Sequence, residues 1–156
     1  MHLWLLSERA ALTLWVGGMW ATGYLVAPVL FRMLDDRAQA GAIAGQLFAI
    51  SNWIGLACIA LLLLGALARH GRAWFSDWRA WVLLAALASV LIAEFALAPM
   101  MRELKAAAGG DLVAHAGLHR RFATLHGVSS TLFVLTSLLG LVLALFGVTR
   151  MNVSNA

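Results

Sequence analysis

The stretch AWVLLAALASVLIAEFALAPMM, residues 80–101, decides the fold of this chain. It contains a single charged side chain, Glu94, and it is long enough to cross the roughly 30 Å hydrocarbon core of a bilayer as a helix. Three further apolar runs of this kind cover residues 10–31, 47–68 and 122–149. Backbone groups in lipid must find partners within their own segment, so we expect every run to be α-helical.

Composition agrees with a chain whose main partner is the lipid bilayer. Of the 156 residues, 63% are hydrophobic and 12% are charged, a balance that soluble domains of this size do not show. Four spans with short connections use nearly the whole length, so we expect one all-α transmembrane domain, a four-helix bundle. The net charge of +4 lies in loops between apolar runs and forms no continuous basic face, which argues against nucleic-acid binding.

An even number of spans places both chain termini at one membrane face, which we call the terminal face. The connection 69–79 also belongs to this face, and it concentrates Arg69, Arg72 and Arg79 in a short loop. In the longer connections 32–46 and 102–121, acidic residues dilute the basic ones. Because cytoplasmic loops are enriched in Lys and Arg, we expect cytoplasmic termini in a bacterial inner membrane.

The chain contains an internal repeat. VAPVLFRML at residues 26–34 matches LAPMMREL at 97–104 with one residue deleted, and a Phe-Ala pair opens the following run in both halves. Each half is therefore a helical hairpin, and the two hairpins are expected to be parallel repeats. Proline near the end of a span removes a backbone donor and bends the helix, and the arginine that follows marks the membrane interface. The motif residues are Pro28, Arg32, Pro99 and Arg102.

Two ionisable residues lie within the apolar runs, and such residues are functional candidates because they are costly in hydrocarbon. At 1.5 Å per residue, Glu94 lies about 10 Å inward from the end of its run and His126 about 7 Å inward. We expect these two side chains to face each other across the bundle and to be coupled. With Asn52 and Tyr24 they form a predicted polar centre, which either joins the helices by hydrogen bonds or binds a proton, metal or substrate.

A second set of candidates would bind metal. His115 and His119 have the i, i+4 spacing that places two ligands on one helix face, and His126 follows them. Met100 and Met101 offer soft thioether ligands suited to Cu(I). Two surface histidines without metal have the same spacing, so this alternative stays open. The sequence has no phosphate-binding glycine loop, no Ser-His-Asp order and no CxxC motif, so we do not expect an enzyme.

Four segments carry a resemblance to a known group: LWVGG at 14–18, APVLF at 27–31, AGQLF at 44–48 and RFATLHG at 121–127. The chain resembles an uncharacterised bacterial domain-of-unknown-function membrane family akin to transmembrane-protein-205-like proteins. More distantly it is similar to four-helix groups that include the copper-resistance protein CopD and the haem-linked HemJ. The near family implies no activity. The distant groups imply copper or haem, but their fuller sets of ligands are not matched here residue by residue.

These observations favour a small membrane protein with a transport, metal-handling or accessory role around the polar centre. One alternative is a membrane oxidoreductase that binds haem through His126, which would be coloured when purified. Another is a structural subunit of a homo-oligomer or of a larger membrane complex, which would co-purify with its partners.

The topology predicts the result of a reporter-fusion experiment. Fusions after Ala156 and within 69–79 should report one side of the membrane, and fusions near Gln39 and Gly109 the other, because each span reverses the side. Any other pattern would contradict four spans.

Overall fold

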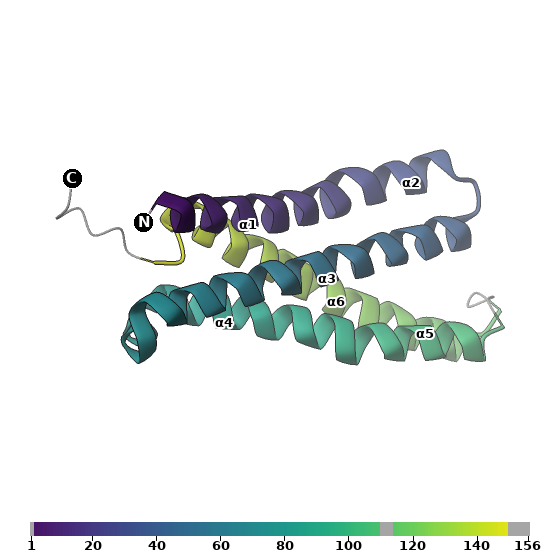
Figure 1. The fold of residues 1–156 in the computed structure, drawn as a ribbon. Coiled ribbons are helices and arrows are strands. Elements are labelled where there is room, and N and C mark those ends of the chain that lie inside the picture. The colour runs from purple at the N-terminus through teal and green to yellow at the C-terminus, as the bar shows by residue number, and fades with distance from the viewer. Residues whose placement is uncertain (1, 110–113, 150–156) are drawn as a thin grey trace.

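The computed structural model describes residues 2–109 and 114–149, and within these residues it is all-helical, as the sequence predicts. Four long helical stretches form a bundle (Figure 1). Some of them contain short turns of another helical type, which are labelled η. In chain order the elements are α1 (His2–Trp20), η1 (Ala21–Val26), α2 (Ala27–Met33), α3 (Arg37–His70), η2 (Gly71–Ser76), α4 (Trp78–Leu91), η3 (Ile92–Leu97), α5 (Ala98–Ala107) and α6 (Ala116–Phe146).

Four stretches of the described residues are long and apolar enough to cross a membrane, so the protein is an integral membrane protein. They are Leu3–Met33, Arg37–Ser76, Trp78–Ala107 and Ala116–Phe146. Around the bundle, α1 packs against α3 and α6, and α4 packs against the same two helices. Figure 1 places the start of α1, the α3–α4 connection and the end of α6 at one end of the bundle. This arrangement agrees with an even number of spans.

The helices extend beyond the apolar runs at several ends. Between the first two runs, in residues 32–46, only 34–36 lie outside a helix. Asp36 caps the long helix α3. Its Oδ1 accepts hydrogen bonds from the backbone N–H of Ala38, at 2.8 Å, and of Gln39, at 3.2 Å.

Hydrogen bonds of Glu8 and Trp74 to Val148, which we call the terminal clasp, join α1 and η2 to the end of the described chain. Helix α6 ends at Phe146, before the expected Thr149, because Gly147 adopts a positive φ of 75°. Glu8 of α1 is only 4% exposed, and its Oε1 accepts a hydrogen bond from the backbone N–H of Val148 at 2.6 Å. Trp74 of η2 is buried, and its Nε1–H donates to the Val148 carbonyl at 3.1 Å.

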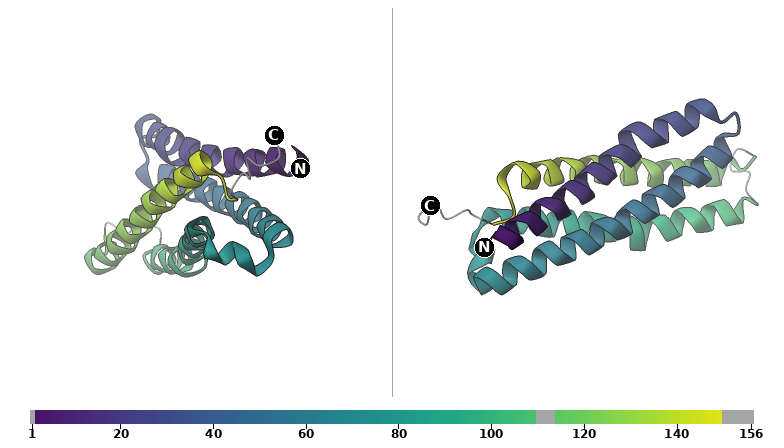
Figure 2. Two further views of the ribbon diagram at one scale, coloured as in Figure 1. Left: turned by 90° about the vertical axis from the view of Figure 1, so that its left-hand side faces the viewer. Right: turned by 45° about the horizontal axis from the view of Figure 1, so that its top comes forward.

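The hydrophobic core occupies the terminal half of the bundle. The main cluster of buried apolar side chains comes from the second half of α1, the second half of α3, η2, α4, the end of α6 and Val148. Outside this cluster, Ala40 and Ala44 near the start of α3 are also buried. By contrast, α2 and α5 contain no buried residue, and the first buried residue of α6 is Thr136. At the non-terminal end, α2 packs on α3 and α5 packs on α6. Figure 2 shows the bundle from two further sides, with its helices running side by side and crossing at an angle.

The clasp predicts a stability effect. Glu8→Ala should lower the free energy of unfolding in detergent by about 1–3 kcal/mol, because the enclosed N–H of Val148 loses its acceptor. Glu8→Gln keeps an acceptor oxygen and should lose less. The exposed neighbour Arg9 provides the control, and an Arg9→Ala loss as large as that of Glu8→Ala would contradict the clasp.

Candidate functional site

Two π-helical turns shape the middle of the bundle. In η1 the N–H of Ala27 donates to the carbonyl of Thr22, and in η3 the N–H of Ala98 donates to the carbonyl of Ala93, five residues back in both cases. Each turn directly precedes an Ala-Pro pair. Proline has no N–H, and in an α-helix its ring clashes with the carbonyl four residues back, so a wider turn relieves the clash. The expected effect of proline was a bend, and the structure contains a widened turn.

Both prolines lie towards the same end of the bundle. Figure 1 shows α2, which begins with Ala27-Pro28, and α5, which begins with Ala98-Pro99, at the end opposite the termini. The arginines of the motif, Arg32 and Arg102, are exposed there. The wider claim of two parallel repeats stays a prediction, which superposition of the two hairpins tests.

Glu94 is the central residue of the candidate site. It belongs to η3 and is 8% exposed. Its Oε2 accepts a hydrogen bond from Nδ2 of Asn52 on α3, at 3.0 Å. Its other oxygen, Oε1, receives no hydrogen bond from the described residues, and it is not among their fully enclosed polar atoms. One carboxylate oxygen is therefore fixed by a neutral amide, and the other is free to accept a ligand.

A pair of aromatic rings stands beside this hydrogen bond. Trp53 follows Asn52 on α3 and Phe95 follows Glu94 in η3, and their rings meet edge to face at a centroid distance of 5.8 Å. Both rings are more than half exposed on the bundle surface. The two contacts together fix α3 against η3 at the level of the carboxylate.

Further hydrogen bonds join η1 to the neighbouring helices α3 and α6. Thr22 of η1 and Ser51 of α3 share a hydrogen bond of 2.8 Å between their hydroxyl oxygens. The hydroxyl of Tyr24 donates to Ser137 of α6 at 3.3 Å. Side chains on both π-helical turns are thus hydrogen-bonded to neighbouring helices. We call the set Thr22, Tyr24, Ser51, Asn52, Glu94 and Ser137 the polar belt.

The structure therefore brings Asn52 to Glu94, while Tyr24 bonds to Ser137. His126 is exposed, and its ring stacks on that of Phe122 at 6.0 Å. The Lys105 ammonium lies 5.3 Å from the same phenyl ring. No hydrogen bond joins Glu94 to His126 in the described part of the chain, and their coupling stays a prediction.

The residues expected to bind metal lie on or beside the start of α6. His115 precedes the first residue of the helix and is not helical, so the i, i+4 spacing does not place it on the helix face with His119. Both side chains are exposed. Over residues 2–109 and 114–149, no three His, Cys, Asp or Glu side chains form a group able to hold a metal ion. Met100 is exposed and Met101 half-buried on α5.

An aromatic cluster lies next to the polar belt, and we call it the Phe133 plug. The Phe133 ring of α6 is 5.4 Å from the ring of Tyr24 and 5.6 Å from that of Phe48 on α3. It also covers Gly23 of η1, where an added Cβ would displace the ring. Glycine therefore lets the ring lie close to η1, and rings from three spans meet at one level.

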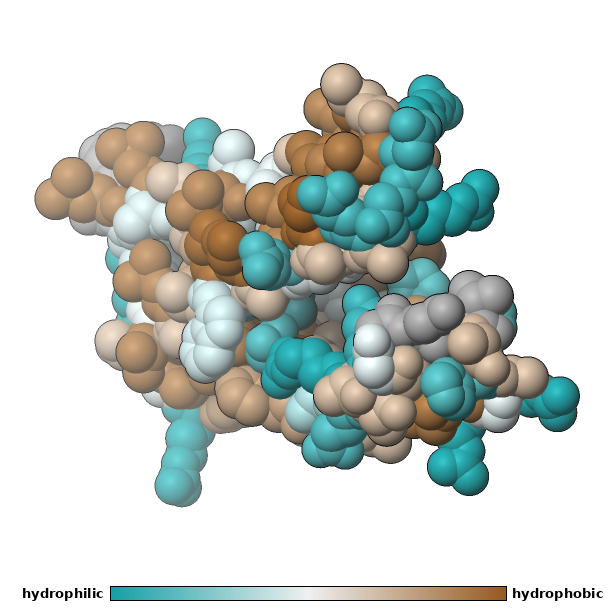
Figure 3. Space-filling model, turned by 90° about the vertical axis from the view of Figure 1, so that its right-hand side faces the viewer, coloured by the Kyte–Doolittle hydropathy of each residue, from teal (hydrophilic) through white to brown (hydrophobic). Residues whose placement is uncertain are grey.

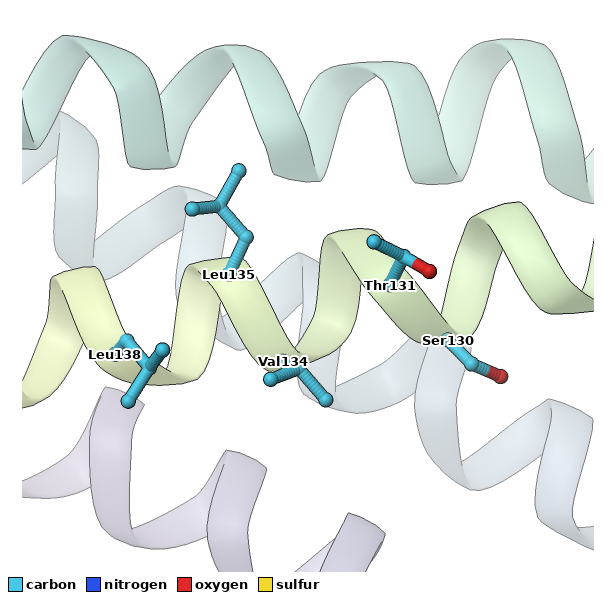
Figure 4. A pocket seen from close by; sticks show the side chains of 5 residues that line it. All are labelled: Ser130, Thr131, Val134, Leu135 and Leu138. Atoms are coloured by element: carbon cyan, nitrogen blue, oxygen red, sulfur yellow. The ribbon is translucent and has the colours of Figure 1, made fainter.

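A surface cavity of about 440 Å³ is found along α6. Its lining consists of Ser130, Thr131, Val134, Leu135 and Leu138 (Figure 4). Ser130 and Thr131 donate their hydroxyl protons back to carbonyls of their own helix, and none of the five residues belongs to the polar belt. Three of the five lining side chains are apolar, and the cavity lies outside the polar belt.

The Asn52–Glu94 hydrogen bond predicts non-additive effects on stability. In a double-mutant cycle with Asn52→Leu and Glu94→Leu, we expect a coupling free energy of about 0.5–2 kcal/mol, the range for interhelical hydrogen bonds in membranes. The control cycle pairs Glu94→Leu with Ser51→Ala, because Ser51 bonds to Thr22. Additive effects in the first cycle, or equal coupling in both, would contradict the pairing. A parallel cycle with His126→Ala tests the predicted histidine coupling.

Comparison with known proteins gives a family. A family model described as "Domain of unknown function (DUF4149)" matches residues 10–110, which include α1 from Ala10 through α5 and hence five of the six polar-belt residues. No curated protein and no solved structure matches the chain. The protein is a member of the DUF4149 family.

Proposed function

We propose that this protein is a small membrane transport protein that moves positive charge, as a proton or a small cation, and that Glu94 is the group that binds it. The observation that carries the proposal is a carboxylate within a membrane span, 8% exposed, with one oxygen held by Asn52 and the other without a hydrogen bond from the described residues. Intramembrane carboxylates are rare because they are costly, and they mark ion and proton pathways.

The chemistry of the site favours a positive ligand. An ionised carboxylate only accepts hydrogen bonds, so it attracts protons and cations. Its neighbour Asn52 is neutral, and among the described residues the one ion pair is Arg79–Asp77, at the other end of α4. A buried charge is costly unless its polar atoms have partners. Both oxygens of the buried Glu8 have them, in the N–H of Val148 and the hydroxyl of Thr149. Oε1 of Glu94 has none among the described residues, and in the proposed role the transported ion is its partner.

The π-helical turn supports the same proposal. Such turns concentrate at functional sites, and Pro99 removes a backbone donor just after η3. One carbonyl near Glu94 therefore lacks an α-helical partner, and carbonyl and carboxylate oxygens are the ligands that hard cations prefer. Copper and haem have no comparable support, because the three histidines expected to serve them are not grouped and His126 is stacked on Phe122.

The proposed location is a bacterial inner membrane with the termini in the cytoplasm. The support is the crowding of Arg69, Arg72 and Arg79 into the connection at the terminal face, where η2 keeps the loop short. The charge would then enter or leave the bundle at the opposite, non-terminal face.

The test is charge flux in proteoliposomes under a membrane potential, with protons, Na⁺ and K⁺ supplied in separate arms. Wild-type protein should carry one of the three, and Glu94→Gln should reduce the flux to that of empty vesicles, because it removes the charge and keeps an acceptor for Asn52. Glu103→Gln makes the same chemical change at an exposed site on α5 and should leave the flux unchanged.

Equal flux through wild type and Glu94→Gln would overturn the proposal. Absence of flux with a Soret band in the purified protein would favour the haem alternative. Absence of flux with stoichiometric co-purification of another membrane protein would favour the structural subunit.

A further inference from the structure

We infer that the non-terminal half of the bundle is an aqueous vestibule that leads from the membrane surface to Glu94 and ends at the Phe133 plug. The inference deepens the proposed function and rests on it for the role of Glu94. It assigns the route by which a hydrated proton or cation reaches the carboxylate, and it names the residue that closes that route.

The first support is the uneven packing of the bundle. The core cluster lies in the terminal half, while α2, α5 and residues 116–135 of α6 contain no buried residue. The buried residues at the non-terminal end are small, namely Ala40 and Ala44 of α3 and Ala108. At the non-terminal end, each hairpin packs within itself, α2 on α3 and α5 on α6. Figure 3 looks onto this end and shows the two hairpins as separate masses with the surface hollowed between them.

The second support is the chemistry of the helix face that contains the plug. Counting back from Phe133 along α6 by three, four and seven residues reaches Ser130, Ser129 and His126, which share its face of the helix. All three are polar, and none of them is buried. The Ser130 hydroxyl is bonded to the carbonyl of His126, but the hydroxyl of Ser129 and the ring nitrogens of His126 have no hydrogen bond from the described residues. Lipid tails offer them no partners, whereas water does. Counting forward from Phe133 by four and seven residues reaches Ser137 and Gly140, which are both buried in the terminal half of the bundle.

The third support is the position of the plug itself. Phe133 covers Gly23, contacts Tyr24 and Phe48, and lies one helical turn from Ser137, the partner of Tyr24. On α6 it therefore separates the polar stripe from Ser137. Oε1 of Glu94 keeps some exposure, while the core towards the termini is closed. A ligand entering from the non-terminal face meets Glu94 before it meets the core.

The test is labelling of single cysteines by a charged, membrane-impermeant thiol reagent in oriented vesicles. The native Cys58 is replaced by Ser, and a tag after the last residue reports which side is the terminal one. Ser130→Cys should be labelled from the non-terminal side, and Ser137→Cys should be protected from both sides. Adding Phe133→Ala should abolish the protection, so that Ser137→Cys reacts as fast as Ser130→Cys from the same side.

The control is Leu135→Ala, a truncation of a large apolar side chain at an exposed position two residues away. It should leave Ser137→Cys protected. Phe133→Leu keeps an apolar side chain in the plug and should give intermediate protection. This variant keeps the test valid if Phe133→Ala misfolds. Sided labelling of Ser130→Cys within each variant reports that the bundle has kept its topology.

Failure of Ser130→Cys to react would mean that lipid or another protein fills the non-terminal half, and it would overturn the vestibule. Reaction of Ser137→Cys without any change at Phe133 would overturn the plug. Neither outcome depends on transport. If Glu94→Gln loses its flux but the labelling contradicts the vestibule, the proposed function stands and only this route to Glu94 is wrong.

Discussion

A single constraint underlies this structure: in hydrocarbon, every polar group must find its partner inside the protein. For the backbone, the constraint makes all four spans helical. At Ala27-Pro28 and Ala98-Pro99 the α-helix cannot satisfy it, because proline lacks the donor, and the chain responds with a π-helical turn before each proline. These turns contain Thr22, Tyr24 and Glu94, three of the six polar-belt residues. The irregular backbone and the polar side chains therefore occur together.

The same constraint explains why the bundle has two unlike halves. Towards the termini, apolar packing is dense, and the only deeply buried acid, Glu8, is used to accept the N–H of Val148. Beyond the belt the helices continue well past the apolar runs, since polar residues such as those that open α3 are stable in a helix once water surrounds them. The carboxylate of Glu94 lies at the boundary between these two environments, where a ligand can reach it without crossing the core.

Much of the fold and part of the candidate site can be predicted from the sequence. The features that cannot be predicted have physical reasons. The four spans follow from length and hydropathy, and the cost of a charge in lipid singles out Glu94, which the structure joins to Asn52. The helix ends do not follow from hydropathy, which reports where lipid ends, because capping by Asp36 and the conformation of Gly147 decide where the helix ends. The interhelical hydrogen bonds of Thr22, Ser51 and Ser137 were not predicted. Hydroxyl groups in helices often bond to their own backbone, as those of Ser89 and Thr136 do. The sequence pattern does not distinguish such hydroxyls from those that bond to another helix.

The central claim is that Glu94 exchanges its ligand, and infrared difference spectroscopy of the reconstituted protein tests it most directly. Spectra are recorded on changing pH, and on exchanging Na⁺ for K⁺, in wild type, Glu94→Gln and Glu103→Gln. The account predicts a carboxyl difference band in wild type and in Glu103→Gln that is missing in Glu94→Gln. Identical difference spectra in all three proteins would contradict it, because Glu94 would then keep the same state under every condition and would serve only to join η3 to α3.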